Sequence, residues 1–244
     1  DPCGWKKKPL GGLARKATIL DQLEQSNENP IVIDAGDLFF KKDIIEPGIT
    51  IETSKINAEI IAKTFNKMGC DAFSPGSKDF AGGISFLRNL SSKSNFDFIS
   101  CNIKDLNSNF LFQEYKIADY QNLKIGIIGA SSIFSSNGIY VEEPFYSINQ
   151  TLSKIKDQCD VLILLFNASD SDYKKLTTLD LNIDFIVRGN TRRKTTSGGG
   201  NIAPIYSLKL IISFVSIAAE KNPTATSKAK RILIRPGSST STLK

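Results

Sequence analysis

The chain has 244 residues, of which 41% are hydrophobic and 23% charged, so it can bury a full core and does not have the composition of a disordered protein. Its net charge is +6, but Lys and Arg are scattered along the chain instead of forming the stripe typical of nucleic-acid binding, so we expect no nucleic-acid partner. The chain contains no histidine, which excludes most catalytic triads and most histidine-ligated metal sites.

The first part of the chain predicts alternating helices and strands. Apolar residues recur at helical spacing over residues 12–25, and the β-branched run that begins at Ile31 predicts a buried strand. A polar loop then leads to a second helix, which ends before Gly69. A short strand is expected over 71–74 and a third helix over 82–90. This order is typical of a β-α winding.

The second part of the chain predicts one more helix and several strands. The helix is expected over 148–158. The strands are expected over 96–100, 124–129, 160–166, 184–187, 205–210, 212–217 and 231–235, the pair 205–210 and 212–217 lying side by side. Alternation followed by consecutive strands predicts an α/β fold with two sheets between helices. We expect one domain over residues 1–235 and a flexible tail over 236–244, which is rich in Ser and Thr.

An acidic turn follows the first predicted strand. The run 34–39 reads DAGDLF and places Asp37 at the carboxyl end of that strand, where α/β sheets build their sites. It resembles the second motif of the calcineurin-like metallophosphoesterases, in particular the 5′-nucleotidase branch, and the runs 11–15 (GGLAR) and 76–80 (GSKDF) resemble the GG-x-AR and GNHEF segments of that branch. The resemblance implies a four-layer α-β-β-α sandwich of the metallophosphoesterase type. It also implies that Asp37 matches a carboxylate shared by two metal ions.

The run 76–80 departs from the pattern of the family. Ser77 stands in the place of the asparagine, Lys78 in the place of the histidine and Asp79 in the place of the glutamate. A charged lysine has no lone pair with which to bind a cation, and it repels one. Asp37 is thus the one aligned ligand that keeps its chemistry.

The later positions implied by the resemblance have also lost their imidazoles. Asn167 stands where the family has a metal-binding histidine, and Asn190 and Arg192 stand where it has the two histidines of a G-H-T-H segment. We therefore expect no metal ion and no cofactor. Instead we predict an ion pair of Asp37 with Lys78 or with Arg192, because a side-chain cation then supplies the charge that metals supply in the family.

Three functions fit these residues. The first is a non-catalytic protein that serves as a binding or scaffolding component, with protein partners, in an extracytoplasmic assembly. The second is an active phosphoesterase with a Mg²⁺ or Ca²⁺ site made only of oxygen ligands. Its ligands would be Asp37, Asp79, Asn167 and Asn190. The third is a metal-free receptor for a phosphate or nucleotide. Its anion-binding residues would be Lys78, Arg188 and Arg192.

Location and surface follow from the same observations. The branch is mostly extracytoplasmic, so we expect a periplasmic or cell-surface protein whose leader, or an N-terminal membrane anchor, precedes Asp1. The longest apolar stretch, 202–219, contains Lys209 and predicts strands, so we expect no transmembrane span. The four cysteines have no C-x-x-C spacing, and we expect buried thiols at Cys70, Cys101 and Cys159, with a paired or modified thiol as the alternative at Cys3. The aromatic segments 39–40, 110–112 and 145–146 are the expected partner interfaces, with core packing as the alternative for each.

Overall fold

The computed structural model describes residues 12–25, 30–120 and 122–190, together with the backbone of the strands 195–197, 205–207, 213–218 and 231–235. Cys3, Arg192 and the predicted tail 236–244 lie outside the described residues.

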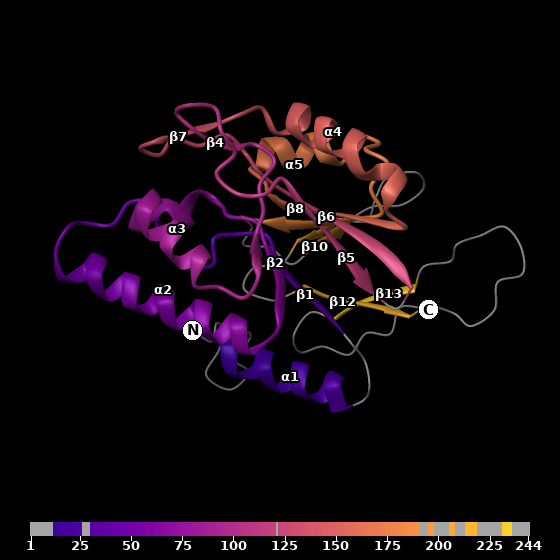
Figure 1. The fold of residues 1–244 in the computed structure, drawn as a ribbon, viewed down its shortest axis with the longest axis horizontal. Coiled ribbons are helices and arrows are strands. Elements are labelled where there is room, and N and C mark those ends of the chain that lie inside the picture. The colour runs from indigo at the N-terminus through magenta and orange to yellow at the C-terminus, as the bar shows by residue number, and fades with distance from the viewer. Residues whose placement is uncertain are drawn as a thin grey trace, which may run out of the picture.

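Most of the described strands form two sheets that pack face to face (Figure 1). The five-stranded sheet has the order β13-β12-β1-β2-β3. Its strands are β1 (Ile31–Asp34), β2 (Cys70–Phe73), β3 (Asp97–Phe98), β12 (Ser213–Ala218) and β13 (Arg231–Arg235). The six-stranded sheet has the order β10-β11-β9-β8-β6-β5. Its strands are β5 (Tyr115–Tyr120), β6 (Leu123–Ser131), β8 (Val161–Asn167), β9 (Phe185–Gly189), β10 (Thr195–Ser197) and β11 (Ile205–Ser207). A small sheet pairs β4 (Ile103–Asp105) with β7 (Ile139–Val141).

Helices cover the outer face of each sheet (Figure 1). The first sheet is covered by α1 (Leu13–Gln25), α2 (Ile49–Lys67) and α3 (Ile84–Ser92), and the second by α4 (Pro144–Ile155) and α5 (Asp170–Leu176). Two 3₁₀ turns complete the described elements, η1 (Ser77–Gly82) and η2 (Lys156–Gln158). This arrangement is the predicted four-layer α-β-β-α sandwich of the metallophosphoesterase type.

The alternation of side chains along each strand explains the layers. On β1, Val32 faces the helices and packs in a cluster with Leu20 and Phe65, whereas Ile33 faces the other sheet and packs in a cluster with Ile163. On β8 the alternation is the same, because Leu164 packs toward α4 while Ile163 lies between the sheets. Strands buried on both faces need continuous apolar runs, and such runs made these strands predictable.

The predicted pairing of the strands over 205–210 and 212–217 is wrong. β11 lies in the second sheet, parallel to β9, and β12 lies in the first sheet, antiparallel to β1. Neighbours in sequence pair often but not always. Here the chain crosses from one sheet to the other, and β12 fills the edge of β1 that β2 leaves open.

Some elements gave no clear signal in the sequence. β5 is an edge strand with half-buried side chains and two charged residues, and α5 is a polar helix of 7 residues. Residues 77–82 form η1, which carries three of the predicted site positions.

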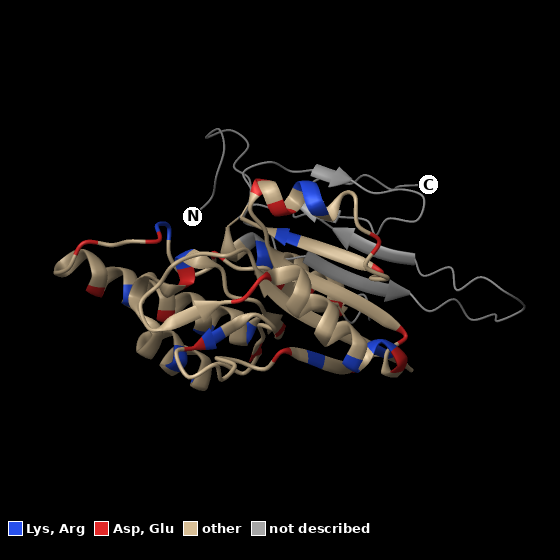
Figure 2. Ribbon diagram, turned by 90° about the horizontal axis from the view of Figure 1, so that it is seen from above, with Lys and Arg blue, Asp and Glu red and all other residues tan. Residues whose placement is uncertain are grey.

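Two expectations about the surface need correction. Phe39 and Phe40 are each 4% exposed and Phe145 is 8% exposed, so these rings belong to the core and offer no interface. Two residues of the expected interfaces do reach the surface. Phe110, in the segment 110–112, is 40% exposed, and Tyr146, in the segment 145–146, is 57% exposed. Figure 2 shows Lys and Arg interspersed with Asp and Glu over the described elements.

Among the described residues, no helix has the length and apolar character needed to cross a membrane. Cys70 and Cys101 are buried, Cys159 is partly buried, and all three are free thiols.

Candidate functional site

The turn after β1 places Asp37 at the carboxyl edge of the first sheet. Asp34 Oδ1 accepts the Gly36 N–H at 3.0 Å, and both Gly36 and Asp37 are in the left-handed region, with φ of 95° and 60°. Gly36 cannot carry a side chain, because a Cβ there would lie 2.7 Å from the Ser74 carbonyl oxygen. This reversal aims the Asp37 carboxylate at the loop that follows β2.

The carboxylate of Asp79 accepts hydrogen bonds from the backbone of the same turn. Its Oδ2 accepts the N–H groups of Asp37 and Gly76, each at 2.8 Å, and its Oδ1 accepts those of Leu38 and Phe39, each at 2.9 Å. Successive backbone N–H groups form a concave anion site, and a residue of the same chain fills it here. The side chain is fully buried. Burial and the nearby Asp37 carboxylate raise the pKa of Asp79 to about 7, although the backbone N–H groups oppose the shift.

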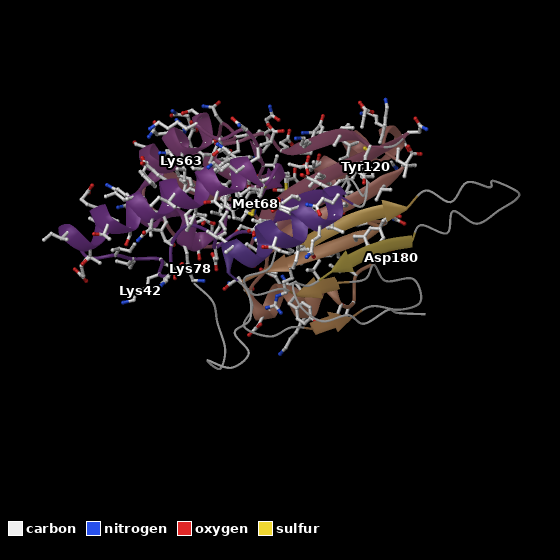
Figure 3. All side chains as sticks on the ribbon, turned by 90° about the horizontal axis from the view of Figure 1, so that it is seen from below. Lys42, Lys63, Met68, Lys78, Tyr120 and Asp180 are labelled. Carbon is white, nitrogen blue, oxygen red and sulfur yellow. The ribbon has the colours of Figure 1, made fainter. Side chains whose placement is uncertain are left out.

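Lys78 occupies the other side of Asp37. Its ammonium is bound to Oδ2 of Asp37, and its backbone N–H donates to Oδ1 at 3.3 Å. The Asp37 side chain is 10% exposed and that of Lys78 28% exposed, and Lys78 is labelled in Figure 3. The predicted ion pair between Asp37 and Lys78 is present, and both carboxylate oxygens of Asp37 have a partner from one residue.

Asn167 closes the site from the second sheet. Its Nδ2 donates to the carbonyl oxygen of Ala35 at 3.1 Å and so ties the end of β8 to the end of β1. A Cβ at Gly76 would lie 2.4 Å from the Asn167 amide and 2.6 Å from Asp37 Oδ1. A Cβ at Gly189 would lie 2.0 Å from the Ala35 oxygen. The glycines therefore allow strand ends from both sheets to meet around Asn167.

The remaining predicted positions lie at the rim or elsewhere. Ser77 donates its hydroxyl to Asp43 at 2.6 Å, outside the central group, and Asn190 is exposed at the end of β9, with φ of 54°. Arg188 is 4% exposed and faces the helix side of its sheet. There it donates to Asp170 at 2.6 Å and its guanidinium lies 4.2 Å from the centre of the Tyr173 ring. The fold thus brings together Asp37, Lys78, Asp79 and Asn167.

Sequence reasoning missed a buried asparagine beside the site. Asn102 is fully buried, and its Nδ2 donates to the carbonyl oxygens of Ser131 at 2.7 Å and Glu142 at 3.0 Å, while its Oδ1 accepts the Ser131 N–H at 3.0 Å. Its signal was a polar residue two positions after the strand expected over 96–100. Ser131 ends β6 opposite Asn167, and its hydroxyl is the one buried side-chain polar atom of the described residues without a hydrogen bond.

The donor set does not fit a pair of divalent cations. The ammonium of Lys78 binds Asp37, the aspartate that the resemblance assigns to both ions. Both carboxylate oxygens of Asp79 accept hydrogen bonds from backbone N–H groups. Within the part of the chain that the structure describes, no three His, Cys, Asp or Glu residues are grouped so as to hold a metal ion. Asn167 and Asn190 offer only neutral oxygens, which are weak ligands.

Comparison with known proteins points to nucleotidases. The chain is 27% identical over 196 residues to a snake venom 5′-nucleotidase of Gloydius brevicauda and 28% identical over 179 residues to the 5′-nucleotidase of Bos taurus. These matches cover 74% and 71% of the chain but 32% and 27% of the relatives, so the chain spans about a third of the length of the curated relatives it matches. No model of a known protein family matches the chain.

Solved structures show the same fold at low sequence identity. A putative 5′-nucleotidase from Staphylococcus aureus superposes with a TM-score of 0.73 over 100% of this chain and 53% of that one, at 15% identity. The calcineurin-like phosphoesterase YfkN from Bacillus subtilis gives a TM-score of 0.66 over 92% of this chain and 80% of that one, at 18% identity. The sheets and helices described above are therefore those of metallophosphoesterase-type domains.

Proposed function

We propose that this chain, which resembles 5′-nucleotidases and has the fold of calcineurin-like phosphoesterases, is a non-catalytic form of that fold and serves as a binding or scaffolding component of an extracytoplasmic assembly. The observation that carries the proposal is the contact between Lys78 and Asp37. A two-metal phosphoesterase needs carboxylates that bridge its ions, and here the matching carboxylate is neutralised by a lysine of its own chain.

Charge supports the proposal as much as ligand count does. Two divalent cations next to the Lys78 ammonium would repel it, and each would lose Asp37 as a ligand unless Lys78 moved away. The cluster is also supported from outside the pair, because Asp79 fixes the backbone on both sides of it. A built ion pair accounts for these contacts without any metal chemistry.

An oxygen-only metal site has less support. It requires Asp37, Asp79, Asn167 and Asn190 to aim oxygens at one point. Asp79 instead accepts four backbone N–H groups, and Asn190 is exposed at the end of its strand.

A metal-free phosphate or nucleotide receptor also has less support. Arg188 was one of its expected anion donors, but it is buried against Ala168 and Asp170 on the helix side of the second sheet. Lys78 would have to leave Asp37 to bind an anion.

The extracytoplasmic location is part of the proposal. It is supported by relatives that are 5′-nucleotidases of snake venoms and by the structural match to a 5′-nucleotidase precursor from Thermus thermophilus. Protein partners are also part of the proposal, because a protein that catalyses no reaction acts through the molecules that its surface binds.

The test is a metal-dependent phosphatase assay on the purified chain beside Asp37→Asn. Asparagine tolerates the left-handed backbone of residue 37 and removes the charge. We expect no saturable hydrolysis of p-nitrophenyl phosphate with Mg²⁺, Mn²⁺ or Zn²⁺, and no difference between the two proteins. An exposed acid on β5, changed as Asp119→Asn, is the matched control. Saturable turnover that Asp37→Asn abolishes and Asp119→Asn leaves intact would overturn the proposal.

A further inference from the structure

The outward face of α2 carries isoleucines where a surface helix normally carries polar residues. Ile49 is 87% exposed, Ile56 59% and Ile60 53%. The inward face of the same helix is already used, because Ala58, Ala62 and Phe65 are buried against the core. A helix on the surface of a soluble domain needs one apolar face, and α2 has two.

The spacing of the outward isoleucines is that of a helix-pairing seam. Ile49, Thr53, Ile56 and Ile60 follow one another at intervals of four, three and four residues, and Thr53 is exposed as well. This alternation keeps one line of side chains on a single face over several turns, as in packed helix pairs. We call these four residues the α2 stripe. The helix has 19 residues, long enough for such a pair, and it lies in the outermost layer of the fold (Figure 1).

Charges at the two ends of α2 have opposite sign. Glu52 lies in the first turn, with a side chain 67% exposed even though it contacts Lys55 of the same helix. Lys67 lies in the last turn, and both Lys63 and Lys67 are exposed. Lys63 projects from α2 in Figure 3. The stripe therefore runs from an acidic end to a basic end.

A surface of this kind is complementary to itself when turned end for end. We infer that the part of the α2 stripe around Ile56 and Ile60 binds the same part of α2 in a second copy of this chain, with the two helices antiparallel about a two-fold axis. In that arrangement Ile56 packs against Ile60 of the second copy, and Glu52 of each copy lies beside Lys63 of the other. The antiparallel order also sets the positive end of each helix dipole beside the negative end of the other. A two-fold interface uses the same patch on both copies, as the stripe requires.

Dimer formation through the surface of α2 does not depend on the proposed function. Other exposed apolar residues of the described chain do not show the same pattern. Ile133, for example, is 66% exposed but lies in a loop and has no helical series around it. Scattered single residues of this kind are normal, whereas a continuous line marks an interaction site.

Sedimentation of the full chain over a range of concentrations tests the inference. We expect a reversible monomer–dimer equilibrium. Ile56→Glu and Ile60→Glu should each raise the dimer dissociation constant about tenfold or more, because a charge would be buried in the seam. Ile133→Glu, at an isoleucine that is 66% exposed, should leave the constant unchanged. Both stripe positions are exposed, so circular dichroism should show that these variants remain folded.

Charge reversal tests the antiparallel order. Glu52→Lys and Lys63→Glu should each weaken the dimer by about two- to fivefold, the range of an exposed ion pair, and the double variant should recover the lost affinity. A chain that stays monomeric at every concentration would overturn the inference, because the stripe would then bind no second copy of the chain. A dimer that survives Ile56→Glu and Ile60→Glu would overturn it equally.

Discussion

The ammonium of Lys78 is bound to the carboxylate of Asp37, and the backbone N–H of Lys78 donates to the other oxygen of the same group at 3.3 Å. The two residues lie 41 positions apart and join the turn after β1 to the turn after β2. An ion pair therefore closes the edge of the sheet where a metallophosphoesterase would bind its ions.

Removing the ammonium should lower stability. In Lys78→Met the Asp37 carboxylate, which is 10% exposed, loses its charged partner. We expect the free energy of unfolding to fall by about 1–2 kcal/mol, less than for a fully buried pair because the Lys78 side chain is 28% exposed. Urea unfolding measures the change. Lys78→Arg keeps the charge and should cost less, so equal losses in both variants would argue against the ion pair as the cause.

The role of Asp79 in holding the turn is tested by Asp79→Asn. The amide group presents a donor where two backbone N–H groups already point, so both lose their acceptor. We expect a loss of about 3 kcal/mol in the free energy of unfolding. The control is Asp43→Asn at the exposed partner of Ser77, which should change stability by about 0.5 kcal/mol or less. Similar losses at the two positions would show that the buried hydrogen bonds are not special.

The close approach of the strand ends can be tested at two glycines. Gly76→Ala and Gly189→Ala should each destabilise the protein by about 3 kcal/mol, because a Cβ would lie 2.4 Å from the Asn167 side chain or 2.0 Å from the Ala35 carbonyl oxygen. Adding Asn167→Ala should partly rescue Gly76→Ala, whose first contact is a side chain. It should rescue Gly189→Ala less, because the nearest contact there is the backbone oxygen of Ala35 at 2.0 Å, while Asn167 Nδ2 lies farther away at 2.9 Å. Unfolding free energies of the wild type, the three single variants and the two double variants form two double-mutant cycles, and equal rescue in both cycles would contradict the geometry.

A buried lysine away from the site predicts a dependence on alkaline pH. Lys16 is 9% exposed and its ammonium lies 4.5 Å from the centre of the Phe65 ring. Burial lowers its pKa from 10.5 to about 8, although Asp34 and Cys70 oppose the shift. The pKa of Lys16 is lower in the folded protein, so burial disfavours the charged form of its amine. The contribution of Lys16 to the free energy of unfolding is therefore largest above pH 10.5, where the amine is neutral in both states, and is lost as pH falls through about 8. The unfolding free energy of the wild type minus that of Lys16→Met should therefore rise over that interval, and a flat difference would contradict the burial of a charged Lys16.

The layers of the fold could be predicted because their strands are apolar on both faces. The run at Ile31 and the run that forms β8 each signal a strand in the middle of a sheet. The partners of β11 and β12 could not be predicted, because both runs fit a hairpin as well as a crossing between sheets. β5 escaped prediction because an edge strand needs no continuous apolar run.

The ion pair at the site could be predicted from the resemblance together with charge. The resemblance sets Lys78 and Arg192 near Asp37, opposite charge then predicts a pair with one of them, and the structure shows the pair with Lys78. The hydrogen bonds of Asp79 could not be predicted from the sequence, because its partners are backbone N–H groups whose direction depends on the left-handed turn at Asp37. The burial of Arg188 was missed for a related reason. Its partner Asp170 lies on α5, a helix with little signal of its own.

The most direct test of the central claim is an anomalous difference map from crystals of the full chain grown with excess Mn²⁺. We expect no manganese peak within coordination distance of Asp37, and ordinary electron density that places the Lys78 ammonium within hydrogen-bond distance of the Asp37 carboxylate. Two manganese peaks bridged by Asp37, with Lys78 displaced, would contradict it.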